Sequence, residues 1–241
     1  MRPVVFWRGN MEIHGLQKLT LLDFPGHTAC TVFTGRCNFR CPFCQNASLV
    51  LRPESLAVIP EADVFAFLEK RKGLLDGVAV TGGEPTLQPD LKDFLRRVKA
   101  LGFETKLDTN GARPDVLRSL LSEGLVDYAA MDIKSSPAGY ARCAGVSDKV
   151  LASVRESAAL LEASGIDHEF RTTAVKGLHT PEDFRAIGAW LAGTEKYFIQ
   201  SYVDSGDILE PGMAAFSEEE LEELLAAIRP FIPGASLRGV D

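Results

Sequence analysis

The strongest constraint on the fold is a regular alternation of strand-like and helix-like segments between residues 28 and 201. Short apolar runs bounded by turn residues predict strands, and longer segments with apolar residues at helical spacing predict helices. The six expected strands are 28–34, 77–81, 103–108, 126–133, 168–175 and 197–201. The expected helices are 61–72, 87–101, 114–123, 149–164, 181–192 and 218–228.

Strands that alternate with helices form a parallel sheet with right-handed crossovers. Six such units are too few for a closed eight-fold barrel, so we expect an α/β fold, an open and partial (βα)6 barrel of the TIM type. We expect residues 1–12 to form an N-terminal leader. Residues 13–241 should then form a single domain that ends with the helix at 218–228.

Composition excludes several classes of protein. Of the 241 residues, 46% are hydrophobic and 24% charged, which are ordinary globular values and argue against disorder. The net charge of −7 argues against a broad nucleic-acid-binding face. No apolar run approaches the ~18 residues of a membrane span, and the short apolar run before Arg8 is too brief for a secretory signal. We therefore expect a cytoplasmic protein without nucleic-acid or membrane partners.

Three of the five cysteines fall within eight residues, as Cys37, Cys41 and Cys44 in a C-x3-C-x2-C arrangement. Thiolates this close can point from one loop toward a single metal centre. Zinc would need a fourth ligand, such as a nearby histidine or Cys30, whereas an iron–sulfur cluster held by three cysteines keeps one iron open. The spacing alone leaves both centres open. Cys30, in an apolar run, and the isolated Cys143 are expected to be core residues.

Polar and glycine-containing clusters stand at the ends of the predicted strands. After the cysteine motif they are Thr81-Gly82-Gly83-Glu84-Pro85, Asp108-Thr109-Asn110-Gly111, Met131-Asp132-Ile133-Lys134, Arg171-Thr172-Thr173 and Gln200-Ser201-Tyr202. In barrels of parallel strands, chemistry lies where the C-terminal ends of the strands meet their loops, so these clusters should share one rim. Carboxylates, cations and glycines converging beside a metal loop describe a pocket for a charged small molecule.

These motifs resemble those of the radical S-adenosylmethionine superfamily, above all Cys37-x3-Cys41-x-Phe43-Cys44 and Gly82-Gly83-Glu84-Pro85. Within the superfamily, the chain is similar to the activating enzymes of glycyl-radical enzymes. The similarity is greatest to the group that activates anaerobic ribonucleoside-triphosphate reductase. Residues 15–26 and 32–46 carry this closer resemblance, and the similarity as a whole runs from about residue 13 to residue 205.

The resemblance implies a role for each residue of the cysteine motif. Cys37, Cys41 and Cys44 would hold three irons of a [4Fe–4S] cluster. The fourth iron would bind the amino and carboxylate groups of S-adenosylmethionine. Phe43, between the last two cysteines, would cover the adenine end of this ligand.

The resemblance also implies how the glycine motif and the strand expected at 168–175 contact the ligand. The backbone of Gly82 and Gly83 would approach S-adenosylmethionine, which side chains at these positions would obstruct. Glu84 would lie near the ammonium group of the ligand. Arg171 would face the ligand carboxylate, where its planar fork suits a two-point contact.

Asp108, Asp132 and Lys134 would position the ribose and the methionine carboxylate, again as the resemblance implies. In some members of the family, the equivalents of Asp108, Thr109 and Asp132 also hold a monovalent cation, which makes this cation a further expectation. Some relatives have a histidine near the end of the strand that corresponds to the one expected here at 197–201. This chain has Gln200-Ser201-Tyr202 there, so the resemblance assigns no contact at that strand end.

The activity implied by the resemblance is reductive cleavage of S-adenosylmethionine to methionine and a 5′-deoxyadenosyl radical, with an electron from flavodoxin or ferredoxin. The radical would take a hydrogen atom from a glycine Cα of anaerobic ribonucleotide reductase. One alternative keeps the cofactors but changes the target to another glycyl-radical enzyme, of the pyruvate formate-lyase type, or to an unrelated substrate. Another alternative is a zinc or iron–sulfur module without chemistry of its own.

Overall fold

In the computed structural model, which describes residues 11–239, eight strands pair side by side in the order in which they follow one another along the chain. The strands are β1 (Ile13–Thr20), β2 (Ala29–Thr34), β3 (Gly77–Gly82), β4 (Glu104–Thr109), β5 (Tyr128–Asp132), β6 (Asp167–Ala174), β7 (Tyr197–Ser201) and β8 (Ser236–Arg238). β1 is antiparallel to β2, and every later pair is parallel. This order, with a helical connection after each of β2 to β7, confirms the expected partial (βα)6 barrel.

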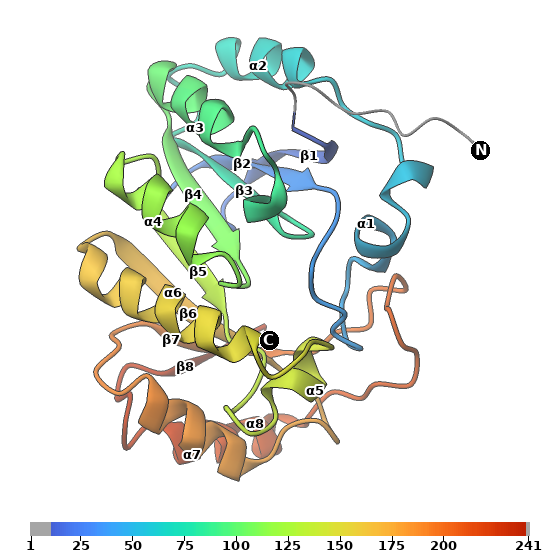
Figure 1. The fold of residues 1–241 in the computed structure, drawn as a ribbon, viewed down its shortest axis with the longest axis vertical. Coiled ribbons are helices and arrows are strands. Elements are labelled where there is room, and N and C mark those ends of the chain that lie inside the picture. Colours follow the sequence, from blue (N-terminus) through green and yellow to red (C-terminus); the bar gives the residue numbers. More distant parts are fainter. Residues whose placement is uncertain (1–10, 240–241) are drawn as a thin grey trace.

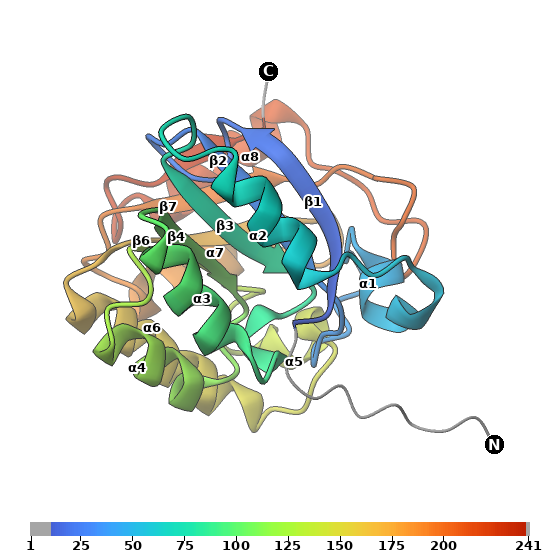
Figure 2. The same ribbon diagram turned by 90° about the horizontal axis from the view of Figure 1, so that it is seen from above.

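The longer helices cover one face of the curved sheet and leave the other face on the inside (Figures 1 and 2). The α-helices are α1 (Ala47–Leu51), α2 (Glu61–Glu69), α3 (Leu91–Ala100), α4 (Pro114–Ser122), α5 (Tyr140–Ala144), α6 (Val150–Ser164), α7 (Pro181–Trp190) and α8 (Glu218–Ile228). Two 3₁₀ turns, η1 (Pro53–Ser55) and η2 (Pro85–Leu87), complete the described secondary structure. No helix among residues 11–239 has the length and apolarity that crossing a membrane requires.

The sheet has two strands more than the six expected. β1 carries the sequence IHGLQKLT, whose apolar residues follow no clean alternation because the strand lies at the sheet edge and is partly exposed. β8 has only three residues, too few for a pattern, and its partner is the neighbouring β7. Both additions are edge strands, where burial constrains the sequence least.

Several boundaries also differ from the expected ones. The helix expected at 87–101 begins at Leu91, because Pro89 and Asp90 interrupt the helical backbone after the η2 turn. The helix expected at 61–72 ends at Glu69. By contrast, β7 and α8 have the predicted bounds residue for residue.

Met11 and Glu12, the last two residues of the expected leader 1–12, contact the domain. Met11 is buried, and its backbone N–H donates to the Glu61 carboxylate (3.2 Å). The backbone N–H of Glu12 donates to the Gln88 side chain (3.0 Å), and its carboxylate pairs with Arg36 (2.7 Å). These two residues therefore belong to the packed domain. Residues 1–10 lie outside the described part of the chain.

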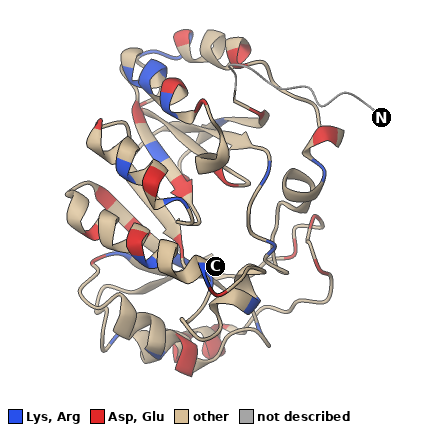
Figure 3. Ribbon diagram, viewed as in Figure 1, with Lys and Arg blue, Asp and Glu red and all other residues tan. Residues whose placement is uncertain are grey.

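Alternation along the strands gives the two faces of the sheet opposite characters. Leu107 and Phe170 are fully buried and belong to the apolar core. Their neighbours Lys106 and Glu169 are also buried but point to the other, inner face, because successive side chains of a strand alternate. A buried polar inner face is therefore available to build a site. On the outside, Figure 3 shows charges of both signs interspersed over the helices.

Candidate functional site

A cavity of about 230 Å³ lies at the C-terminal ends of the parallel strands. Every site residue expected from the sequence lines this cavity except Glu84. The expected residues that line it are Cys37, Cys41, Phe43, Cys44, Gly82, Gly83, Asp108, Asp132, Lys134 and Arg171. The fold thus brings motifs from five strand ends to one place, as the position of these motifs in the sequence predicts.

The cysteine loop, defined here as residues 35–46, follows β2 and brings its three thiols to one wall of the cavity. The Cys37 Sγ accepts a hydrogen bond from the backbone N–H of Phe39 (3.3 Å), and the Cys41 Sγ lies 3.8 Å from the carbonyl oxygen of Ala144 in α5. Within residues 11–239, no three Cys, His, Asp or Glu side chains come close enough to hold a single metal ion. The three thiols line the same cavity, as the three protein ligands of one iron–sulfur cluster would.

Burial is the main electrostatic influence on these thiols. It raises the pKa of Cys41 to about 12 and that of Cys37 to about 11, and the Glu84 carboxylate contributes to the rise at Cys37. A thiol must lose its proton to bind metal, so positively charged irons would supply the stabilisation that burial removes. Cys30 and Cys143 are fully buried in the core and line no part of this cavity, which confirms their expected role.

Gly82 and Gly83 are required by contacts between protein segments. A Cβ on Gly82, which has a φ of 118°, would lie 2.3 Å from the backbone nitrogen of Thr34. A Cβ on Gly83 would lie 1.9 Å from the carbonyl oxygen of Arg36. The Gly83 N–H donates to the Thr34 carbonyl (2.8 Å) and the Glu84 N–H to the Arg36 carbonyl (2.7 Å). The glycines therefore let the end of β3 pack directly against the start of the cysteine loop, a reason that the sequence does not indicate.

Glu84 is only 1% exposed, and its carboxylate is directed to protein groups. It accepts hydrogen bonds from the N–H (3.1 Å) and hydroxyl (2.5 Å) of Thr86, the hydroxyl of Thr109 (2.8 Å) and the N–H of Asn110 (2.7 Å). Burial raises its pKa, and these four donors oppose the rise. Glu84 thus ties the end of β3 to the end of β4. Its expected contact with a ligand ammonium group stays a prediction.

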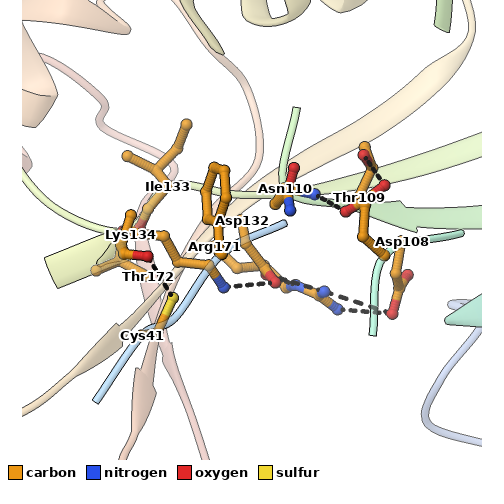
Figure 4. Close-up of polar contacts among 12 residues, drawn as sticks. Cys41, Asp108, Thr109, Asn110, Asp132, Ile133, Lys134, Arg171 and Thr172 are labelled. Atoms are coloured by element: carbon orange, nitrogen blue, oxygen red, sulfur yellow. Dashed lines mark hydrogen bonds and ion pairs between the residues drawn. The ribbon is translucent and has the colours of Figure 1, made fainter. Parts of the chain in front are cut away.

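Asp108, Asp132, Lys134 and Arg171, which we call the charged cluster, form a network of ion pairs on β4, on β6 and at the end of β5 (Figure 4). Arg171 lies 2.9 Å from the Asp132 carboxylate and 3.4 Å from that of Asp108. Lys134 lies 3.0 Å from the other Asp132 oxygen. The parallel register places Asp132 directly beside Arg171, so the sheet itself brings these charges together.

The charged cluster keeps both carboxylates ionised. Burial opposes ionisation of Asp108, but Arg171 and the buried Lys106 hold the pKa of Asp108 below its usual range. Burial likewise opposes ionisation of Asp132, and Arg171 together with Lys134 holds its pKa low. Because Arg171 bridges the two carboxylates and Thr109 donates to Glu84, the residues expected to bind a monovalent cation already have protein partners. That cation stays a prediction.

Two further residues on the cavity wall received no definite role from the sequence. Asn110 donates to Asn38 (2.8 Å) and lies 3.7 Å from the Cys37 Sγ, which connects the end of β4 to the cysteine loop. In the sequence, Asn110 followed by glycine suggests only a turn. The signal that could have assigned Asn110 to the site is its position at the end of a predicted strand. Gln200, at the end of β7, also lines the cavity.

Phe43 is buried on the wall and packs edge-on against His179, with 6.1 Å between ring centroids.

Comparison with known proteins agrees with this site. The family model described as "Radical SAM superfamily" matches residues 31–191, more than half of the chain. A protein of Methanocaldococcus jannaschii named "Putative glycyl-radical enzyme activating enzyme MJ1227" is 27% identical over 95% of this chain and 96% of its own length. A "7-carboxy-7-deazaguanine synthase" of Methanopyrus kandleri is 28% identical over 65% of this chain and 70% of its own length.

Solved structures share the fold at low sequence identity. Streptococcus suis SuiB bound to S-adenosylmethionine superposes with a TM-score of 0.64 at 16% identity, over 85% of this chain and 48% of SuiB. The chain therefore spans about half the length of that protein. "Native anSMEcpe with bound AdoMet" superposes with a TM-score of 0.57 at 15% identity, over 82% of this chain and 58% of the other. With the family model matched across the cysteine loop and five of the strand ends, the chain belongs to the radical S-adenosylmethionine superfamily, whose members use a [4Fe–4S] cluster and S-adenosylmethionine.

Proposed function

We propose that this protein is the activating enzyme of a glycyl-radical enzyme, and that its target is anaerobic ribonucleoside-triphosphate reductase. The observation that carries the first part is the agreement in length with the M. jannaschii relative, which is named for this activity and matches along 95% of this chain and 96% of itself. The deazaguanine synthase relative matches over a smaller share of both chains. The second part rests on the resemblance of residues 15–26 and 32–46 to the reductase-activating group.

In this proposal Cys37, Cys41 and Cys44 hold the cluster, since all three thiols lie on one wall of the cavity. With three protein ligands, one iron remains open for the amino and carboxylate groups of S-adenosylmethionine. When bound, the cluster and S-adenosylmethionine supply the reductive cleavage that yields methionine and a 5′-deoxyadenosyl radical. The chain's own part is to bind the ligand, to orient it and to exclude water.

The charged cluster is suited to bind the carboxylate end of the ligand. Lys134 and Arg171 line the cavity and pair with Asp132, and Arg171 also pairs with Asp108. A lysine has three N–H donors and an arginine five, so both side chains can donate to a ligand carboxylate as well as to these aspartates.

The aromatic and backbone groups of the wall complete the proposed ligand contacts. Phe43 offers a buried ring on the cysteine side of the cavity, and Gly82 and Gly83 offer backbone without side chains. Asp108 and Asp132 are ionised and can accept hydrogen bonds from ribose hydroxyls. In the proposed reaction the electron comes from flavodoxin or ferredoxin, and the hydrogen atom comes from a glycine Cα of the partner enzyme.

The test is anaerobic. The protein is reconstituted with iron and sulfide, reduced with dithionite and given S-adenosylmethionine together with either purified anaerobic ribonucleotide reductase or pyruvate formate-lyase. We expect 5′-deoxyadenosine in both mixtures and a glycyl-radical signal in the electron paramagnetic resonance spectrum with the reductase. A radical only on pyruvate formate-lyase would overturn the target, and 5′-deoxyadenosine without a radical on either partner would overturn the activase proposal.

A further inference from the structure

The segment 203–210, between β7 and α8, lies along the cysteine loop and beside α1 (Figures 1 and 2). Backbone hydrogen bonds join the two segments along their length. The Leu209 N–H donates to the Cys44 carbonyl (3.2 Å), and the Glu210 N–H donates to the Pro42 carbonyl (2.9 Å). We call residues 203–210 the clamp. About 160 residues of chain separate this segment from the loop that it contacts.

Side-chain hydrogen bonds extend the contact between the clamp and the cysteine loop beyond Cys44. The Ser205 hydroxyl donates to the Gln45 carbonyl (3.0 Å), and the Gln45 side-chain amide donates to the Val203 carbonyl. The clamp therefore binds the carbonyl groups of Pro42, Cys44 and Gln45 in turn. These residues flank and include the last cysteine of the motif.

Asp207 is the residue of the clamp that makes charge-assisted hydrogen bonds to α1. Its carboxylate accepts from the Ser48 N–H (3.0 Å) and from the Ser48 hydroxyl (2.8 Å), and its carbonyl accepts from the Ala47 N–H (3.0 Å). α1 begins at Ala47, and its own N-cap residue, Asn46, makes no side-chain capping bond. Asp207 thus caps α1 from a distant part of the chain.

The clamp matters for the thiol at Cys44 because it supplies the backbone hydrogen bonds that join residues 42–46 to a distant segment. This part of the loop is also held by the Cys44 N–H, which donates to the Cys41 carbonyl (3.0 Å), and by the Asn46 side-chain amide, which donates to the Gly82 carbonyl (3.5 Å). On the opposite side, the Arg40 N–H donates to the Ala144 carbonyl (2.9 Å), which holds the loop near Cys41. The part after Cys41 passes directly to Cys44 and then to α1, whose contacts with the clamp are those described above. Without them the backbone around Cys44 would regain conformational freedom.

Resting on the proposed function, in which Cys37, Cys41 and Cys44 hold the cluster, we propose that the clamp fixes the Cys44 side of the cysteine loop so that the iron–sulfur cluster is retained, with Asp207 as the positioning residue. Asp207 does not line the cavity, so its effect on the cluster passes through α1 and the loop backbone. Loss of its charged hydrogen bonds should let Cys44 leave its iron more often. A chelator then gains access to the cluster.

The experiment compares the full-length protein with Asp207→Ala and Asp204→Ala. Asp204 lies in the same clamp and carries the same charge, but its side chain accepts from the Gly206 N–H within the clamp (2.8 Å) and, among residues 11–239, from no group of the cysteine loop or α1. Each protein is reconstituted anaerobically, and the loss of cluster absorbance is followed after addition of bathophenanthroline disulfonate. The melting temperature of each cluster-free form is measured in parallel.

We expect Asp207→Ala to lose its cluster about tenfold faster than the unaltered protein, which is the effect of losing charge-assisted hydrogen bonds. Asp204→Ala should match the unaltered protein in both measurements, and cluster-free Asp207→Ala should melt no more than about 2–4 °C lower, the shift expected from a lost helix cap. Loss of the cluster from Asp207→Ala at the unaltered rate would overturn the proposal. If cluster-free Asp207→Ala melts lower than that, Ser48→Ala decides, because it removes only the hydroxyl donor: faster loss supports the proposal, and an unaltered rate overturns it.

Discussion

The two halves of the cavity wall are built by different means. The cysteine loop is held by backbone hydrogen bonds to segments distant in sequence, at Glu84, at Ala144 and in the clamp. The charged cluster stands on adjacent parallel strands, where the register places Asp132 beside Arg171. The comparison shows that one half depends on how loops dock, whereas the other depends on how a sheet pairs. Changes in the first half should affect the cluster, and changes in the second should affect ligand binding and acid stability.

The largest effect is expected from the loop. Cys41→Ala removes one of the three thiols on the cavity wall and should abolish both the cluster and the cleavage of S-adenosylmethionine. The measurements are iron content after reconstitution and 5′-deoxyadenosine formed with dithionite. Cys143→Ala is the matched control, because that thiol is buried away from the cavity. Cleavage that persists in Cys41→Ala would disprove the cluster assignment.

Gly83→Ala tests the docking of the loop on β3. The added Cβ would lie 1.9 Å from the Arg36 backbone oxygen, which cannot move without shifting the cysteine loop. We expect a loss of about 2–3 kcal/mol in the free energy of unfolding, together with poor cluster loading.

Gly124→Ala is the control for this change. Gly124 has a φ of 62° but open space around it, so alanine should cost only about 1–2 kcal/mol for its backbone conformation and leave loading unchanged. Urea unfolding of the cluster-free proteins and iron content give the two quantities. Normal loading of Gly83→Ala would show that the loop does not need this close approach.

Asp132→Asn tests the charged half. It leaves Arg171 and Lys134 without their shared partner, so we expect a loss of about 1–2 kcal/mol in unfolding free energy at pH 7 and weaker ligand binding, with normal cluster loading. The pKa of Asp132 is lowered in the folded protein, so its contribution is present above the unfolded pKa and is lost as pH falls.

The deficit of Asp132→Asn should therefore shrink below about pH 4, near the pKa of an unfolded aspartate. Urea unfolding between pH 7 and pH 3 measures this change. Asp115→Asn is the control, because its ion pair with Arg113 is exposed and should contribute less than about 1 kcal/mol. A deficit that is independent of pH would argue against the ion pairs as its cause.

The smallest effect is expected from Lys134→Ala. Asp132 keeps its partner Arg171 in this variant, so the fold and the cluster should persist while S-adenosylmethionine binds about tenfold more weakly. Equilibrium dialysis of the ligand and the visible absorbance of the reconstituted protein measure the two effects separately. A variant that fails to keep the cluster would place Lys134 in the cysteine half of the wall instead.

Much of the architecture and most of the wall were predictable because their signals are local. Helical and strand periodicity located the six βα units, and the strand-end positions of Asp108, Asp132 and Arg171 placed them on one cavity wall. The edge strands β1 and β8 were missed, since partial exposure and short length weaken the pattern. The direction of the Glu84 carboxylate was missed as well, because its partners Thr109 and Asn110 lie on another strand.

The sequence by itself determined the βα alternation, the three-cysteine loop and the order of polar groups along the rim, because each of these is written in residues close together along the chain. Only the tertiary structure decided that Gly82 and Gly83 serve the contact with the loop, that Arg171 bridges two carboxylates, and that the clamp caps α1. These are contacts between segments tens to more than a hundred residues apart. Spacing along the chain carries no information about which distant backbone groups will meet, since that depends on how the whole sheet curves and how its loops pack.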